Sequence, residues 1–247
     1  MTHLSSVVSV ANPPFCPKCE GCSEREECLL GKLSSDPGAC RKGTAKLPQR
    51  IQLATGEMLF RRMDDCRSLF VICSGAIKTQ RVTAEGHLVV TGLWLPGDIL
   101  GLEALGGAEY EFDAVATKAG TVVRLDVRLL LEVCTQTPAM NIWFTQRLGQ
   151  LLRRRDFDHA SSKCLQSNAR ILRFFLDLHE RTRQDETNQG IEGELPMHKQ
   201  DIARYLNMTP ETLSRNLSTL RRKRLLFISK THYTVPDVAH VRSMAAL

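Results

Sequence analysis

Five cysteines near the start of the chain are the side chains best suited to chemistry. They follow the order C-x2-C-x2-C-x5-C, with a fifth twelve positions later, and are Cys16, Cys19, Cys22, Cys28 and Cys40. The surrounding segment, residues 1–48, is rich in Pro, Gly and Ser and shows little apolar periodicity, so it cannot bury enough apolar surface to order itself. Four thiolates on one metal centre would order it, because soft sulfur ligands select zinc or iron–sulfur clusters.

The cysteine spacing distinguishes between a zinc site and an iron–sulfur cluster. Structural zinc usually shows two C-x2-C pairs with a loop of a dozen or more residues between them, and this arm has no second pair. Iron–sulfur clusters use three or four closely spaced cysteines. The spacing therefore favours an iron–sulfur cluster over zinc, and both over disulfides. Three of the remaining cysteines, Cys66, Cys73 and Cys164, are expected to be small buried side chains.

A second set of functional side chains lies in residues 195–226, where two short helical patterns are separated by a break. Asn207 marks the break, because it tolerates a left-handed backbone. Thr209 is a plausible N-cap for the second helix, and Pro210 fits its first position. A β-hairpin is expected at residues 225–235. The pattern is that of a winged helix-turn-helix.

The second helix of this segment carries side chains that can read DNA. Its leucines share one face, which leaves Glu211, Ser214 and Arg215 on the other. Arg215 can donate to the two major-groove acceptors of guanine, and Glu211 can accept from a cytosine amino group. A further group is expected to contact phosphate, which fixes register rather than sequence: Thr209, Ser218, Arg221, Arg222 and Lys223.

Composition is compatible with this function. The 247 residues are 43% hydrophobic, enough for a core, and carry a net charge of +6, which favours a polyanionic partner. The sequence has no apolar run of membrane-spanning length and no signal-peptide pattern, so a cytoplasmic protein is expected. No Ser/His/Asp set or phosphate-binding loop is present, and an enzyme is not expected.

The elements between the arm and the helix-turn-helix are predicted from periodicity. Residues 49–136 contain short apolar runs, LFVICSG, AIKTQRV, LVVTGLWL and TVVRLD, with glycine punctuation that includes a turn at Ser74-Gly75. Such runs are typical of a compact antiparallel barrel or roll. Residues 137–162 read as a long helix and 168–181 as a linking helix, followed by an exposed polar loop at 182–193. The fold class is therefore α+β.

The chain resembles the Crp/Fnr family of regulators, most of all the iron–sulfur oxygen sensors within it. The resemblance is carried by ETLSR on the recognition helix, the β-rich region before it and the N-terminal cysteines. It implies a cyclic-nucleotide-binding-type β-roll, a dimerisation helix and a winged helix-turn-helix at 163–247. It also implies a homodimer that binds a palindrome resembling TTGAT and ATCAA half-sites and contacts RNA polymerase, to activate or repress.

The resemblance also implies a ligand set for a 4Fe-4S cluster. Cys19, Cys22 and Cys28 fall on the family's C-x2-C-x5-C pattern. The family's fourth cysteine, in the β-roll, is replaced by Val123. Cys16 is the first choice for the missing ligand, and the alternatives are Cys40 and then Cys134. Oxygen, nitric oxide and redox state all remain possible signals, and a zinc arm with a small-molecule or haem signal is the alternative.

The β-roll departs from the cyclic-nucleotide pattern. Family members that bind these ligands carry a Gly-Glu pair followed about ten residues later by an arginine for the phosphate. Here Gly101 and Glu103 are followed by Asp113, with no arginine between. Carboxylates at this place would repel a phosphate, so a cyclic nucleotide is not expected as the ligand.

The long helix is where the family's dimerisation helix falls. An apolar stripe of steps four, four and three predicts the seam, and charged residues follow it. Like charges near a two-fold axis weaken self-association. We therefore expect the second half of this helix to form a marginal zipper. The residues expected at the interface are Met140, Phe144, Leu148, Leu151, Arg155 and Asp156.

Overall fold

The computed structural model describes residues 28–35, 48–107, 109–182 and 190–245, apart from the side chains of 34–35, 154 and 156–164. The chain divides into two compact units, residues 1–81 with 91–149, and residues 82–90 with 150–247. The architecture is mixed α and β, which confirms the predicted fold class. Among the described helices, none is long and apolar enough to cross a membrane.

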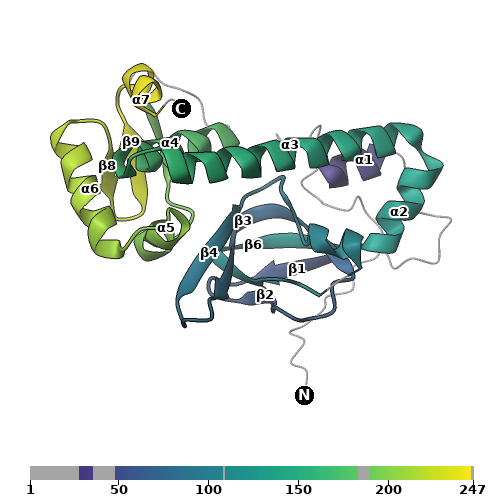
Figure 1. The fold of residues 1–247 in the computed structure, drawn as a ribbon. Helices are drawn as coiled ribbons and strands as arrows, with labels where there is room; N and C mark the ends of the chain where they lie inside the picture. The colour runs from purple at the N-terminus through teal and green to yellow at the C-terminus, as the bar shows by residue number, and fades with distance from the viewer. Residues whose placement is uncertain (1–27, 36–47, 108, 183–189, 246–247) are drawn as a thin grey trace. The chain divides into compact units, whose positions relative to one another are not determined.

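Six strands form one sheet in the N-terminal half of the chain (Figure 1). The order is β1-β6-β3-β4, while β2 also pairs with β6 and β5 with β3. The strands are β1 (Gln49–Leu53), β2 (Met58–Phe60), β3 (Ser68–Val82), β4 (Leu88–Trp94), β5 (Ile99–Leu100) and β6 (Asp113–Asp126). The two longest strands, β3 and β6, run antiparallel and form the centre of the roll.

The turn predicted at Ser74-Gly75 is wrong, because both residues lie inside the single strand β3. Gly75 has a φ of 84°, and the register of β3 against β6 shifts on either side of Ser74. A β-carbon on Gly120 of β6 would collide with the Ser74 carbonyl group. The two glycines therefore allow a bulge at which the strands approach closely.

Helices close the first unit around one apolar core. They are α1 (Leu29–Ser35), the short 3₁₀ helix η2 (Leu102–Gly106), α2 (Val127–Gln136) and the first half of α3 (Pro138–Cys164). Three leucines of α1, Leu29, Leu30 and Leu33, are at most 1% exposed. They belong to the same core as the inner side chains of β3 and β6. Figure 1 shows α1 beside the first half of α3.

The second unit holds the helix-turn-helix. Its elements are α4 (Ser167–Thr182), β7 (Ile191–Glu194), α5 (Lys199–Tyr205), α6 (Pro210–Arg222), β8 (Phe227–Ser229), β9 (His232–Val235) and α7 (Val238–Met244). The predicted hairpin is β8–β9, and β7 adds a third antiparallel strand. The prediction of an exposed polar loop up to residue 193 is therefore wrong at its C-terminal end, because Ile191 is fully buried in β7. The short IEGE sequence becomes a strand through its distant partner β9.

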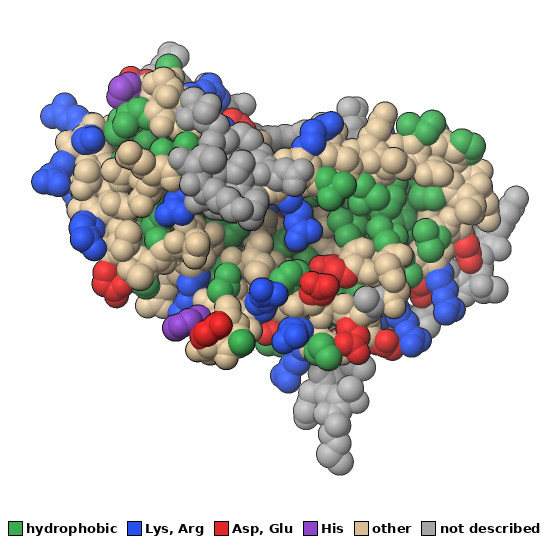
Figure 2. Space-filling model, viewed as in Figure 1, with side chains coloured by type: hydrophobic (Ala, Val, Ile, Leu, Met, Phe, Trp, Pro, Cys, Tyr) green, Lys and Arg blue, Asp and Glu red, His purple; other side chains and the backbone are tan. Residues whose placement is uncertain are grey.

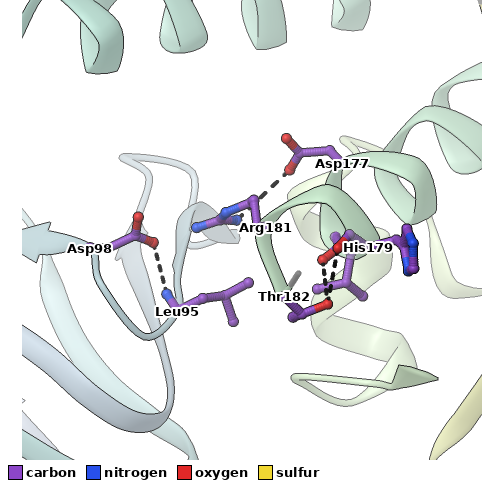
Figure 3. Close-up of polar contacts among 7 residues, drawn as sticks. Leu95, Asp98, Asp177, His179, Arg181 and Thr182 are labelled. Carbon is purple, nitrogen blue, oxygen red and sulfur yellow. Dashed lines mark hydrogen bonds and ion pairs between the residues drawn. The ribbon is translucent and has the colours of Figure 1, made fainter. Parts of the chain in front are cut away.

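Local side-chain contacts fix one turn in each unit (Figure 3). In the first unit, the Leu95 backbone N–H donates to the Asp98 carboxylate at 2.8 Å, and Gly97 between them has a φ of 90°. In the second unit, Thr182 Oγ1 donates to the Leu178 carbonyl at 3.0 Å and closes the end of α4. These bonds satisfy groups that a turn or a helix end leaves open.

Candidate nucleic-acid interface and cysteine sites

The start of α6 is built as the sequence predicts. Thr209 is the N-cap, and its Oγ1 accepts a hydrogen bond from the Thr212 backbone N–H at 3.2 Å. Pro210 opens the helix, and Asn207 in the preceding turn has a φ of 52°. A capped start fixes the direction in which the first turn of α6 presents its side chains.

The two faces of α6 separate as expected. Leu213 and Leu220 are buried, at 2% and 1% exposed, and pack in the helix-turn-helix core. The side chains predicted to read bases, Glu211, Ser214 and Arg215, are all exposed. The structure therefore brings the three together on the outer face of one helix turn, within reach of a groove.

The protonation state of Glu211 suits a hydrogen-bond acceptor. Its pKa is held below the ordinary carboxyl value by hydrogen bonds from its own backbone N–H and from Thr209. The carboxylate is therefore ionised at neutral pH and can only accept hydrogen bonds. Accepting from a cytosine amino group is the base contact that this chemistry allows.

The Ser218 hydroxyl has its proton committed within the helix. Ser218 Oγ donates to the Ser214 backbone carbonyl at 3.0 Å. The lone pairs of the Ser218 oxygen remain available. This oxygen can therefore accept a hydrogen bond from a base or from a neighbouring side chain. This arrangement makes Ser218 a poor donor to phosphate, although Ser218 lies on the predicted face.

Basic side chains continue from the end of α6. Arg221, Arg222 and Lys223 are exposed, and Figure 2 shows Lys and Arg side chains gathered along the edge that α6 forms. Arg222 also donates to Thr219 Oγ1 at 3.3 Å. Such a row suits the salt-dependent contacts that a DNA backbone makes.

A hollow of about 220 Å³ beside α6 adds two residues that the sequence did not single out. Lys199 and Gln200, in the first turn of α5, line it together with Ser214, Ser218 and Arg221. Both are exposed. The sequence pattern that could have identified Lys199 and Gln200 is their position at the N-terminus of α5. Backbone N–H groups at a helix N-terminus favour a phosphate.

The predicted metal ligands fall mostly outside the described residues. Cys16, Cys19, Cys22 and Cys40 lie there, whereas Cys28 is 7% exposed and directly precedes α1. Within the ranges that the structure covers, no three His, Cys, Asp or Glu side chains group as a metal site. Cys28 is thus the predicted ligand whose surroundings are known.

The remaining cysteines have different environments. Cys66 is buried, and Cys73 and Cys134 are partly buried, while the side chain of Cys164 lies outside the described residues. Burial raises the pKa of the Cys134 thiol, which disfavours the thiolate that a metal needs. Val123, which occupies the family's fourth ligand position, is fully buried in β6 between Arg50 and Val71.

The acidic segment of the roll has a structural role. Asp113 at the start of β6 accepts a hydrogen bond from the Arg62 backbone N–H at 2.9 Å. Glu109 and Glu111 are exposed on either side of the buried Tyr110. Asp113 thus joins two segments of the roll that are distant in the sequence.

The first half of α3 presents different residues from those predicted for the seam. Met140 and Phe144 are each 6% exposed and belong to the first unit's own core, and Leu148 packs against that core. Ile142 and Leu152 are instead 61% and 62% exposed. Arg155 is exposed and Leu151 half-buried, while the Asp156 side chain is outside the described residues. Met140 and Phe144 fill the core because α1 and α2 pack against that side of α3.

Two family models match the chain. One describes a cyclic nucleotide-binding domain and matches residues 50–137, and the other describes a Crp-like helix-turn-helix domain and matches residues 169–244. The chain belongs to the Crp/Fnr family. Its relatives include the transcriptional regulatory protein btr of Bordetella pertussis, 26% identical over 235 residues that cover 94% of this chain and 96% of the relative.

Another relative within the Crp/Fnr family is the fumarate and nitrate reduction regulatory protein of Escherichia coli K12. It is 26% identical over 235 residues, or 92% of each chain. Among solved structures, FixK2 of Bradyrhizobium japonicum matches with a TM-score of 0.71 at 20% identity, over 82% of this chain and 99% of that one. A CRP-family regulator of Thermus thermophilus matches with a TM-score of 0.66 at 25% identity, over 79% and 96%.

These matches confirm the fold and the general function expected from the sequence. The relatives are transcription regulators rather than enzymes, and the matched helix-turn-helix contains the exposed face of α6. The protein is a DNA-binding transcription regulator of the Crp/Fnr family.

Proposed function

We propose that this regulator responds to oxygen or redox state through an iron–sulfur cluster held by its N-terminal cysteines. Two observations support the proposal. The cysteine spacing fits a cluster better than zinc, and a relative over most of the chain is named for fumarate and nitrate reduction. The signal would control how tightly the protein dimerises and binds DNA.

The position of Cys28 carries this proposal. Cys28 is the last predicted ligand, and α1 begins at the next residue. Lys32 and Leu33 of α1 line the same hollow, about 200 Å³, as Met140 and Trp143 of α3. A metal centre bound to Cys28 would therefore also hold α1 in position against the start of α3.

The sequence of the arm supplies the four thiolates that a cluster needs. A 4Fe-4S cluster would supply a centre that reacts with oxygen, and Cys16, Cys19, Cys22 and Cys28 would hold it. Cys28 lies in an apolar environment, which shields thiolate ligands from water and tunes a cluster's potential. Val123 cannot replace a cysteine, and we propose Cys16 as the fourth ligand, with Cys40 and then Cys134 as the alternatives.

Dimerisation would use the outer face of α3. Ile142 is exposed, and Thr145 and Gly149 follow it at steps of three and four along the helix. This spacing places the three on one helix face, so that a second copy can pack against them. Two copies of α6 would then read the halves of a palindromic site, and the bound dimer would contact RNA polymerase.

The deciding experiment is the absorption spectrum, with iron, sulfide and zinc analysis, of protein purified without oxygen and then exposed to air. The proposal expects a broad brown absorbance that bleaches in air, with roughly four irons and four sulfides per chain. Colourless protein with one zinc would overturn it, and would leave a regulator whose signal is a small molecule or haem in the β-roll.

The ligand set has its own test. Cys16→Ala is expected to abolish cluster assembly, whereas Cys40→Ala and Cys134→Ala retain it. Cys73→Ala is a matched control, since Cys73 lies in β3. Iron content measured without oxygen distinguishes them, and loss of iron in Cys40→Ala but not Cys16→Ala would reassign the fourth ligand.

The charged half of α3 provides the test of the switch. We expect Asp156→Ala to strengthen dimerisation of cluster-free protein, because it removes a like charge near the two-fold axis. Sedimentation velocity of air-exposed protein measures the effect. An unchanged monomer–dimer equilibrium would contradict a marginal zipper at this place.

A further inference from the structure

A polar hollow of about 490 Å³ opens on the first unit, where β3 begins and β6 ends. It lies within the size range of small-molecule sites. Polar and charged side chains make up most of its lining, beside a few small or apolar ones. The lining residues include Gln49, Ser68, Arg124, Arg128, Ala104 and Val127.

Two guanidinium groups in this hollow have no carboxylate partner among the residues that the structure describes. Arg124 Nε donates to Ser68 Oγ at 2.8 Å, which anchors the side chain. Ser68 is itself only 4% exposed. Arg128, in the first turn of α2, makes no side-chain ion pair with a described residue. The planar ends of both side chains remain able to donate to an anion.

The acidic side chains of the hollow are already engaged. Asp65 pairs with Arg67 at 2.8 Å. Asp126 caps α2 by accepting from the Arg128 backbone N–H at 2.9 Å. The three arginines outnumber the two carboxylates by one, so the lining carries a single net positive charge.

The buried thiol in the wall does not change this balance. Burial and the nearby Glu103 raise the pKa of Cys66 to about 11, so the thiol is neutral at physiological pH. Cys66 also contacts the hydroxyl group of Tyr110, which donates to the Ser68 carbonyl at 2.8 Å. Ser68 is thereby held from two sides, which fixes the point where Arg124 is anchored.

We propose that this hollow is a binding site for a small organic anion, held by Arg124 and Arg128 as a pair of guanidinium donors. Two exposed guanidinium groups, one of them anchored on Ser68, suit a phosphorylated or polycarboxylic metabolite. The hollow does not include Gly101, Glu103 or Asp113, where the family's cyclic-nucleotide phosphate falls. The site would let a metabolite bind the regulator through residues other than those on the exposed face of α6.

Calorimetric titration of the full chain with sodium pyrophosphate and, separately, sodium citrate tests the site, at a constant ionic strength set with chloride. We expect one saturable site per chain for at least one probe. Arg124→Gln and Arg128→Gln are each expected to weaken it at least tenfold. Arg124→Lys should also weaken anion binding. The single ammonium group of lysine cannot keep the hydrogen bond to Ser68 and at the same time donate two parallel hydrogen bonds to the anion.

Two controls locate the binding. Arg50→Gln removes an exposed charge on β1 outside the hollow, and Arg215→Ala removes one from the DNA head. Neither is expected to change the affinity. Thermal melting of each variant shows that it folds. Binding of pyrophosphate alone would assign a phosphate ester, and binding of citrate alone a polycarboxylate.

The proposal is overturned by either of two results. One is no saturable binding of either probe at about 1 mM. The other is equal weakening by the Arg50→Gln or Arg215→Ala variants, which would mark a general polyanion effect of a basic protein. The iron analysis of the cysteine arm has no bearing on either result, so the two proposals fail separately.

Discussion

The Thr209 side chain accepts a hydrogen bond from the Thr212 backbone N–H, 3.2 Å away, at the first turn of α6. The same side chain helps hold Glu211 ionised. One threonine thus caps the recognition helix and also hydrogen-bonds the carboxylate that is expected to contact cytosine.

Removing this cap is expected to destabilise the DNA-binding head. Thr209→Ala should lower the free energy of unfolding by about 1 kcal/mol, because an unpaired N–H at the helix start then relies on water. Thr209→Ser keeps the hydroxyl and should retain most of the stability. Urea denaturation followed by circular dichroism measures both. Equal losses in the two variants would show that the methyl group, not the cap, matters.

The exposed face of α6 predicts two kinds of DNA defect. Arg215→Ala should cost about 1–3 kcal/mol on the specific site and flatten the preference at one base position. Lys223→Ala should weaken specific and random DNA alike and reduce the salt dependence. Binding titrations at several salt concentrations separate the two. Equal losses on both DNAs for Arg215→Ala would contradict its role in base reading.

The recognition helix could be predicted because its determinants are local. The cap at Thr209, the proline that follows and the turn at Asn207 act within a few residues of each other, and the structure keeps all three. The joined strand β3 and the third wing strand β7 could not be predicted in this way. Their pairings, at Ser74 with Thr121 and at Ile191 with Val235, join residues that are more than forty positions apart.

The seam on α3 shows a different limit of sequence patterns. The stripe from Met140 to Leu148 is apolar because it faces α1 and the roll, and a helix pattern does not say which partner covers it. Ile142 stands alone in the pattern, yet it is the exposed apolar residue of this half of α3. The single exposed isoleucine on the other side of α3 draws attention only once the structure shows that the stripe is buried.

Tyr233 predicts how stability responds to alkaline pH. Burial raises its pKa from 10.0 to about 12, and its hydroxyl group has no hydrogen-bond partner among the described residues. The folded state therefore keeps a proton that the unfolded state loses above pH 10. Stability is complete below pH 10 and falls as pH rises toward 12, by roughly 2–3 kcal/mol at about 1.4 kcal/mol per pKa unit. Urea unfolding across this range measures the slope.

Tyr233→Phe is the matched control for this pH effect. It removes the ionisable group and an unpaired buried hydroxyl, so stability at neutral pH should be unchanged or slightly higher. The buried Tyr110, whose pKa is also raised by burial, remains in both proteins and cancels in the comparison. A variant that loses stability at neutral pH would show that the Tyr233 hydroxyl has a partner in solution.

The two faces of α3 predict opposite effects of substitution. Phe144→Ala opens a cavity in the first unit's core and should cost about 3–5 kcal/mol of unfolding free energy. Ile142→Glu changes a side chain that is 61% exposed. It should leave the stability of the monomer unchanged and weaken dimerisation at least tenfold, because it puts a charge in the proposed contact with a second copy.

Sedimentation velocity and thermal melting, applied to both variants, decide between the two faces. Thr145→Glu lies one turn further along the same outer face and should repeat the effect of Ile142→Glu. Gln146→Glu, also exposed, adds the same charge beside that face and should have a smaller effect. If Ile142→Glu dimerises as the unmodified chain does, the contact must lie elsewhere on the helix, and the exposed Leu152 becomes the next position to change.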